Sequence, residues 1–544
     1  MPTPLAVSLL VAAALSSAAT AQTPSIDKVA RSRAGMVASG SPFATAAGVE
    51  ILERGGNAAD AAAATTFAMM VVDPANTSIA GRVQLLVRRA DGVTVPIDGA
   101  TQVPGRVLGL AAGSKAREGF GTVPAPGGVA ALAELVRRHG RLSLGQVLQP
   151  AITLAEHGFA VPSRLAESWG RVARQLARDP GAARHFLKPD GSSYREGETF
   201  RQPALAAVLR AVADSGAEVF YRGRIADQIA RDVASGGGSL RLSDLHHYRV
   251  EPGVLVETEY RGRQVFSAGG RAWGNTLGEL LNILAHFPVD RPMPEPERVE
   301  ILARVIAQAM ADRPQAIGTL APKPNAIPLE RISSPEFGAR RAREIQAAID
   351  AGSLPPDPGA GKVDDHDTTH LSVVDREGNA VALTTSIGPS FGSRVVSPEL
   401  GFLYAYSYRM RDDSVPGVRD LTEMTPTIVL EGDRPILVLG GAGSERIPTS
   451  VLMVLTNVVD RGMDLEASMR APRVFALGRR VRLHDWTAPQ AAERLRARGF
   501  EVSLVPLGAS PHLGLVHAVA FDRDRGEFVG AADFGDAGAA AGPR

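Results

Sequence analysis

The segment from Ala58 to about Met70 constrains the fold more than any other, because almost all of its side chains are small or apolar. Asn57 is suited to cap the start of a helix here, and Asp73-Pro74 is suited to end it. A surface helix keeps one polar face, whereas a helix that is apolar all round is buried on several sides. The segment therefore predicts a helix at the centre of a layered fold.

Helix and strand signals alternate on both sides of this segment. Ser41-Pro42 is typical of a helix start and Gly55-Gly56 of a helix end. The apolar residues between them share one helical face, as expected for Phe43, Ala47 and Ile51. Further elements are predicted as strands at 83–88 and 93–97, helices at 128–139 and 144–158, and a strand pair near 254–266.

The character of the chain changes at 351–367, where Gly, Pro and Asp dominate without an apolar period. This composition predicts an exposed, flexible segment. Strands are predicted immediately after it at 369–374 and 380–386, with later strands at 427–430 and 436–439. A loop at 440–444 and a helix at about 448–459 follow. The pattern indicates an α+β fold in which helices enclose mixed or antiparallel sheets.

The composition excludes several classes of function. Cysteine is absent, so disulfides, thiolate metal sites and a cysteine nucleophile are excluded. The net charge of +1 gives no indication of a nucleic-acid partner.

The N-terminus predicts export to the periplasm or the medium. The run from Leu5 to Ala19 is apolar, and Ala19-Thr20-Ala21 before Gln22 fits a signal-peptide cleavage site. A short membrane anchor is the alternative. No later run of about 18 apolar residues predicts a membrane span.

Two patterns resemble known catalytic motifs without meeting their structural requirements. His366 and His370 have the i, i+4 spacing of a helical metal motif, but the threonines between them favour a strand, so no metal is expected. Ser390 stands in a G-x-S-x-G pattern, with His484, His512 or His517 available downstream as triad partners. The sequence after it favours strand or loop instead of the helix that a nucleophile elbow needs, and a serine hydrolase stays an alternative.

Two other sites suit amide chemistry. The glycines of 440–444 allow backbone N–H groups to approach a reacting carbonyl closely. Thr368 follows the flexible segment, and cleavage of the Asp367–Thr368 bond would make it N-terminal. An N-terminal threonine carries its own base, an α-amine with a pKa of about 8. Pattern alone favours a structural threonine at this position.

Several motifs in a fixed order change this weighting. They are Gly35-Met36-Val37-Ala38-Ser39, Gly55-Gly56-Asn57-Ala58-Ala59-Asp60-Ala61, Pro126-Gly127-Gly128-Val129, Gln149-Pro150-Ala151-Ile152, Thr368-Thr369-His370-Leu371-Ser372-Val373-Val374-Asp375, Gly378-Asn379-Ala380-Val381, Phe391-Gly392-Ser393, Met424-Thr425-Pro426-Thr427-Ile428-Val429 and Gly538-Ala539-Ala540-Ala541-Gly542. Together they resemble the gamma-glutamyltranspeptidases, or glutathione hydrolases, of the N-terminal nucleophile hydrolase superfamily, along nearly all of the mature chain.

The resemblance implies a four-layer αββα sandwich and a precursor that cleaves itself. The signal peptide would be 1–21, the large subunit 22–367 and the small subunit 368–544. Thr368 matches the family's nucleophile, with Thr369 beside it in the substrate site. Ser386 matches a threonine whose hydroxyl supports the nucleophile, and Gly443 and Ser444 match the two oxyanion-hole glycines. No cofactor is expected.

The residues that would bind a glutamyl group are mostly replaced. The family's carboxylate-binding arginine matches Ala100, and its two carboxylate-binding serines match Thr422 and Glu423. An asparagine matches Gly388, and the glutamine and aspartate that hold the substrate amine match Ser407 and Met410. Losing these charged contacts predicts weak recognition of a γ-glutamyl compound. Arg82 and Arg394 form a different anion site in one interpretation and are ordinary salt-bridged arginines in the other.

The sequence therefore predicts an exported, self-cleaving amidohydrolase or acyltransferase that uses N-terminal Thr368 on a small-molecule amide or peptide. Its large and small subunits would come from one precursor, and its substrate would differ from a standard γ-glutamyl compound. A family member with reduced or no catalysis that acts as a binding protein is the alternative, motivated by the replaced residues.

Overall fold

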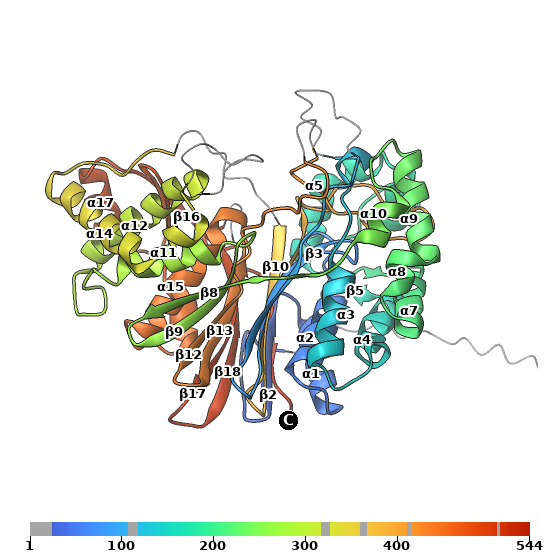
Figure 1. The fold of residues 1–544 in the computed structure, drawn as a ribbon, viewed down its shortest axis with the longest axis horizontal. Coiled ribbons are helices and arrows are strands. Elements are labelled where there is room, and N and C mark those ends of the chain that lie inside the picture. Colours follow the sequence, from blue (N-terminus) through green and yellow to red (C-terminus); the bar gives the residue numbers. More distant parts are fainter. Residues whose placement is uncertain are drawn as a thin grey trace, which may run out of the picture.

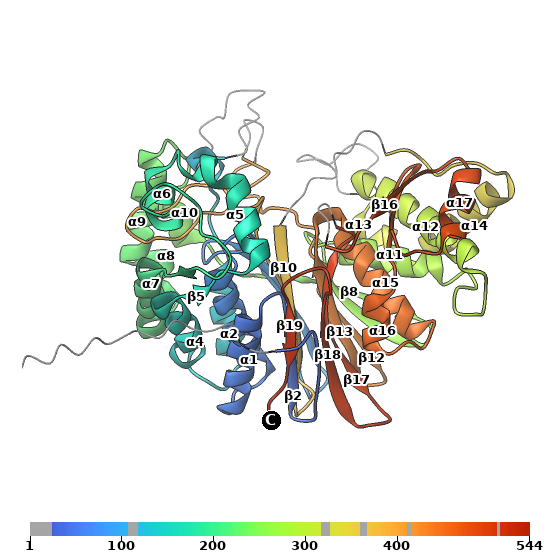
Figure 2. The ribbon, with the colours of Figure 1, turned by 180° about the vertical axis from the view of Figure 1, so that it is seen from behind.

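The computed structural model describes residues 24, 26–106, 118–316, 327–358, 367–410, 415–508 and 512–544. Two seven-stranded sheets, with all their ladders antiparallel, lie face to face at its centre. Figure 1 shows a helical layer outside each sheet, and the view from behind agrees (Figure 2). This arrangement confirms the predicted αββα sandwich.

The first sheet contains the predicted nucleophile. In spatial order its strands are β19 (Ala539–Ala541), β2 (Gly35–Ser39), β10 (Asp367–Asp375), β11 (Ala380–Gly388), β3 (Arg82–Arg88), β4 (Thr94–Gly99) and β7 (Glu251–Pro252). The second sheet runs β1 (Val29–Ser32), β18 (Glu527–Ala532), β17 (Leu515–Asp522), β13 (Arg434–Ala442), β12 (Thr427–Glu431), β9 (Arg263–Gly269) and β8 (Val254–Tyr260).

Ten helices cover the first sheet and seven cover the second in the part of the chain that the structure describes. The first layer comprises α1 (Pro42–Glu53), α2 (Ala58–Val72), α3 (Gly128–His139), α4 (Leu144–His157), α5 (Ser163–Leu176), α6 (Pro180–Phe186), α7 (Pro203–Ser215), α8 (Glu218–Arg222), α9 (Arg224–Ser235) and α10 (Leu242–His247). The second comprises α11 (Gly274–Leu284), α12 (Glu295–Ala316), α13 (Leu329–Ile332), α14 (Pro335–Asp350), α15 (Ile447–Val459), α16 (Leu465–Arg470) and α17 (Pro489–Ala497).

Smaller elements complete the two outer layers. A short hairpin pairs β5 (Phe159–Ala160) with β6 (Thr199–Phe200). A three-stranded sheet beside α17 consists of β14 (Val474–Leu477), β15 (Arg480–His484) and β16 (Glu501–Val505). Single 3-10 turns occur at Phe120–Thr122 and Ser444–Arg446.

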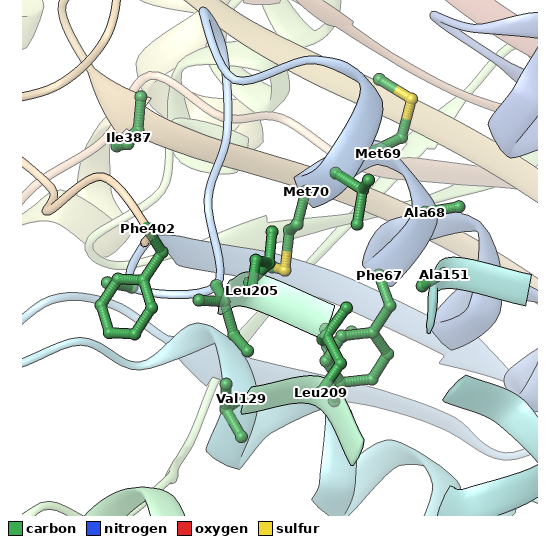
Figure 3. Packing of buried hydrophobic residues seen from close by; sticks show 14 of the residues in the cluster. Phe67, Ala68, Met69, Met70, Val129, Ala151, Leu205, Leu209, Ile387 and Phe402 are labelled. Atoms are coloured by element: carbon green, nitrogen blue, oxygen red, sulfur yellow. The ribbon is translucent and has the colours of Figure 1, made fainter. Parts of the chain in front are cut away.

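The apolar helix α2 is the centre of the first helical layer, as its composition predicts. All fifteen of its residues are buried, and the Asn57 side chain accepts the N–H groups of Ala59 and Asp60. Figure 3 shows Phe67 and Met70 of α2 among Leu205 and Leu209 of α7 and Val129 of α3. Separate apolar clusters fill the space between the two sheets and the space under the second helical layer. The first sheet is therefore packed against apolar side chains on both of its faces.

The predicted elements before residue 350 are confirmed to within a few residues, and so is the predicted β10–β11 hairpin. The prediction of a loop at 440–444 is wrong in its first three residues, because β13 continues to Ala442 and pairs Gly440 with His517 of β17. Residues 359–366 of the predicted flexible segment, and the predicted signal peptide, lie outside the described residues. In the described chain, no helix has the length and apolar character needed to span a bilayer.

Candidate active site

Thr368 lies near the start of β10, a strand held between β2 and β11 in the middle of the first sheet. Its ladder partner is Ser386 of β11, and the register of this ladder shifts between Asp367 and Thr368. The bond predicted to be cleaved is therefore the place where the regular pairing of β10 begins. Asp367 and Thr368 are consecutive here, so the structure is that of the uncleaved chain.

A cavity of about 120 Å³ opens at Thr368. Its walls come from the start of α1, the end of α2, the start of α5, the turn after β13, and the two C-terminal segments around His512 and Asp536. Thr368 itself is 8% exposed. A buried strand therefore presents this threonine to a polar cavity.

The turn after β13 contributes Gly443 and Arg446 to the lining of the same cavity, whereas the neighbouring Ser444 is not among its lining residues. Gly443 has a φ of +122° and Ser444 a φ of +57°, after which the chain enters the 3-10 turn that leads into α15. Arg446 fixes this turn, since its Nε donates to the carbonyl oxygen of Gly443 at 2.8 Å. A Cβ on Gly443 would lie 2.6 Å from Cε1 of His512, so glycine is required.

Hydroxyl groups surround the Thr368–Ser386 pair. The Ser386 hydroxyl accepts the Gly388 N–H at 3.0 Å. The hydroxyls of Thr385 and Thr77 lie 2.8 Å apart. A Cβ on Gly40 would lie 2.6 Å from Oγ1 of Thr369, which places the α1 entry against β10. Short polar side chains thus pack beside the start of β10.

Two histidines face this cavity, although the sequence suggested them only as partners of Ser390. Nε2 of His517 lies 3.3 Å from Oδ2 of Asp536, and both groups are buried. Burial alone raises the pKa of Asp536, but His517, Lys28 and the Gly538 N–H together bring this pKa well below its usual range. The imidazole and the carboxylate are therefore in direct contact at the cavity wall.

His512 is kept neutral. Burial first, and then the charges of Arg446 and Arg164, lower the pKa of His512 well below its usual value. Its Nδ1 accepts the N–H of Gly514 at 3.0 Å. Arg164, Arg446 and Asp536 were not predicted as site residues, because they come from separate segments whose local sequence carries no catalytic motif.

Arg82 lies away from the cavity in a buried polar cluster. Its Nη1 is 3.5 Å from Oδ2 of Asp420. Asp420 also accepts the hydroxyls of Thr101 at 2.6 Å and Ser407 at 2.7 Å. A Cβ on Gly388 would lie 3.5 Å from Nη2 of Arg82. The Arg82–Asp420 pair thus lies beside Gly388 and Ser407, two positions that the resemblance assigns to glutamyl binding. Thr101, which bonds Asp420, is the residue after Ala100.

Arg394 has a different partner. Its Nη1 lies 3.0 Å from Oε2 of Glu118, whose other oxygen lies 2.7 Å from Arg178. Both arginines of the suggested anion site are therefore salt-bridged to separate carboxylates. Their binding of a substrate anion stays a prediction.

Thr422 and Glu423 are also outside the cavity lining. The Thr422 N–H donates to the carbonyl oxygen of Arg271 at 3.0 Å. The Glu423 carboxylate attracts the Arg313 guanidinium. Burial lowers the pKa of Arg313 to about 9, although the charges of Glu423 and Glu279 oppose this change. These contacts hold the segment before β12 in place.

Ser390 does not form a nucleophile elbow. The chain after it continues in turns to an isolated bridge at Val396, without the required helix. Its buried hydroxyl has no hydrogen-bond partner among the described residues. Across all of the residues that the structure describes, no group of three or more His, Cys, Asp or Glu side chains could hold a metal ion.

Comparisons with known proteins agree with this architecture. The family model described as Gamma-glutamyltranspeptidase matches residues 44–543. An Acylase ACY 1 proenzyme of Pseudomonas sp. (strain V22) is 33% identical over 93% of both chains. A glutathione hydrolase proenzyme of Escherichia coli (strain K12) is 30% identical over 92% of this chain and 90% of its own length.

A solved structure of similar shape is the cephalosporin acylase from Bacillus halodurans. It superposes with a TM-score of 0.85 at 28% identity, and it covers 96% of this chain and 98% of its own. Fold and sequence thus agree over almost the whole length, and the chain belongs to the gamma-glutamyltranspeptidase family.

Proposed function

We propose that this protein is an exported, self-cleaving amidohydrolase or acyltransferase whose nucleophile is Thr368. The observation that carries the proposal is the position of Thr368 at the wall of the cavity, together with Gly443. Cleavage by water would leave a carboxylate on Asp367 and an α-amine on Thr368. Relatives whose names include the word proenzyme support such processing. The products would be 22–367 and 368–544.

The catalytic cycle would use Thr368 and the turn at Gly443, both of which line the cavity. The α-amine of Thr368 takes the proton of its own hydroxyl, and Oγ1 attacks the substrate carbonyl carbon. Backbone N–H groups at Gly443 and Ser444 stabilise the oxyanion. The C–N bond then breaks, the proton passes to the leaving amine, and an ester on Thr368 remains. Water, or an acceptor amine, attacks this ester and restores Thr368.

The substrate would lack a standard γ-glutamyl group. The buried Arg82–Asp420 pair supports this part of the proposal, because it lies beside Gly388, a position where the resemblance implies a contact with the glutamyl group. Ser407, which matches an amine-binding residue of the family, is engaged by Asp420. A relative named as an acylase supports an acyl group of another kind.

Processing is tested by expressing the full chain and determining the N-termini of the purified protein. We expect one chain that starts at Gln22 and another that starts at Thr368. Thr368→Ala should remain a single chain, and Thr368→Ser, which keeps a hydroxyl, should still be cleaved. A wild-type protein that stays uncut would overturn the proposal and favour the binding-protein alternative.

Substrate choice is tested with three amides of 4-nitroaniline. They share this leaving group and differ in the acyl group, which is γ-glutamyl, glutaryl or butanoyl. Glutaryl differs from γ-glutamyl only in lacking the α-amine. We expect glutaryl or butanoyl turnover at least equal to γ-glutamyl turnover, and none with Thr368→Ala. A preference for γ-glutamyl of more than tenfold would contradict the proposed change of substrate.

A further inference from the structure

A second chamber, called here the Trp486 chamber, adjoins the cavity at Thr368. It has a volume of about 130 Å³, and its apolar walls come from Met469, Trp486, Leu507 and Phe534. Gly508, His512 and Leu515 line both spaces, so the chamber and the cavity at Thr368 are neighbours that share a wall.

Two of the apolar side chains of this chamber are open to solvent, while Met469 is buried. Trp486 is 40% exposed and Leu507 is 52% exposed, and no other Trp, Phe or Tyr is among the exposed large hydrophobic residues of the described chain. Leaving such surface in water gives up the free energy of burial, and ligand pockets are lined mainly by apolar and aromatic side chains. A ligand that covers Trp486 and Leu507 would recover this free energy.

Several polar groups of the lining are engaged by other groups of the protein. Nε1 of Trp486 donates to the carbonyl oxygen of Arg470 at 3.3 Å. Arg470 lies 3.0 Å from Glu466, and Arg473 lies 2.7 Å from Asp533. The chamber therefore offers a ligand mainly hydrocarbon and aromatic faces.

The histidine rings of the lining are neutral as well. His484 stacks on Trp486 with ring centroids 4.0 Å apart. Burial first, and then Arg473, lower the pKa of His484 to about 3. A neutral imidazole under the indole adds an aromatic surface without adding a charge.

We propose that the Trp486 chamber binds an aromatic ring or a branched alkyl group carried by the amide that Thr368 cleaves. The size fits one ring, since an apolar cavity of about 150 Å³ holds a benzene molecule. This inference rests on the proposed function for the identity of the ligand as a substrate, but the binding itself does not require catalysis.

Binding is tested by fluorine NMR with two probes, 4-fluorophenylacetamide and N-(4-fluorobenzyl)acetamide. The first carries its ring on the acyl side of the amide, and the second carries it on the amine side. We expect line broadening of at least one probe on addition of the purified chain, and the probe that binds more tightly identifies the side of the amide that enters the chamber.

Trp486→Ala should weaken binding of the probe, so that its Kd rises about tenfold or more. Leu507→Ser provides a second variant of the lining, in case the first one fails to fold. Leu504→Ala is the matched control, because Leu504 is 49% exposed on β16 but is absent from the lining. The inference is overturned if neither probe binds, or if Trp486→Ala and Leu507→Ser bind as wild type does.

The outcomes also separate this inference from the proposed function. If the protein binds the ring through Trp486 but never cleaves at Thr368, the proposed binding site stands and the proposed threonine chemistry is wrong. If the protein cleaves at Thr368 but binds no ring, the proposed threonine chemistry stands and the proposed binding site is wrong.

Discussion

Nη1 of Arg82 lies 3.5 Å from Oδ2 of Asp420, and the two side chains are 5% and 1% exposed. The charges are held where water cannot solvate them, so each depends on the other. Burial raises the pKa of Asp420, and Arg82 is the first of the groups that oppose this rise. The pair is a structural element beside Gly388 and Ser407, two positions where the family resemblance implies contact with a ligand.

Arg82→Ala should therefore destabilise the protein, because it leaves the Asp420 carboxylate buried without its cation. We expect a loss of about 3 kcal/mol in the free energy of unfolding, measured by urea denaturation. Combining Arg82→Met with Asp420→Asn removes both charges and should restore most of this loss. A single Arg82→Ala variant as stable as wild type would show that the pair is not coupled.

Gly440 makes a close contact that explains why β13 carries glycines where the sequence suggested a loop. A Cβ on Gly440 would lie 2.3 Å from Cε1 of His370, whose Nδ1 and Nε2 are bound to Thr384 and Ser372. The ring cannot move away without breaking these contacts. Gly440→Ala should therefore destabilise the fold by about 1–3 kcal/mol.

Gly170→Ala is the matched control for this substitution. Gly170 lies in α5 with nothing within 4 Å of its added Cβ, so alanine there should stabilise the helix by about 0.5–1 kcal/mol. Urea midpoints of the two variants should move in opposite directions. Equal midpoints would contradict the packing of His370 on Gly440.

Substitution of Ser386 tests whether its hydroxyl assists Thr368, the proposed nucleophile. It is the ladder partner of Thr368, and its hydroxyl accepts the Gly388 N–H. Ser386→Ala should slow processing at Thr368 about tenfold or more, the loss expected for a buried hydrogen-bonding group. Ser386→Thr keeps the hydroxyl and should process at a rate close to that of wild type.

The readout is the rate at which the 368–544 chain appears, compared with the urea midpoint of the uncut precursor. A purely structural role would lower the midpoint and leave the rate of cleavage unchanged. That outcome would remove Ser386 from the proposed machinery.

Local sequence was enough for most of the fold. The apolar run in α2, its Asn57 cap and the alternation in β10 and β11 are short-range patterns, and each element forms where its pattern lies. The β13 extension was missed, because glycines are typical of loops and the reason for them, the His370 ring, is 70 residues away in the chain.

The cavity could not be predicted in the same way. Gly40, Arg164, His512 and Asp536 meet at Thr368 only after the sheets have formed, and none of them stands in a motif of its own. The Arg82–Asp420 pair likewise joins two distant segments. The sequence suggested an arginine at this place, and it could not show which carboxylate the arginine meets.

His484 provides a test of pH dependence. It is 6% exposed, its Nδ1 accepts the Arg473 N–H at 3.2 Å, and burial, followed by Arg473, lowers its pKa to about 3. An unfolded histidine has a pKa of about 6.5, so below that pH the unfolded chain gains a proton that the folded chain does not accept. The contribution of His484 to stability is therefore complete above pH 6.5 and is lost as the pH falls toward 3.

Asn at this position keeps an acceptor for the Arg473 N–H and does not titrate. Wild type should lose stability relative to His484→Asn by about 1–2 kcal/mol between pH 7 and pH 5, since one pH unit of differential protonation corresponds to about 1.4 kcal/mol. Urea unfolding of both proteins at the two pH values measures this difference. A difference that stays constant would mean that His484 takes up a proton equally in the folded and unfolded chains.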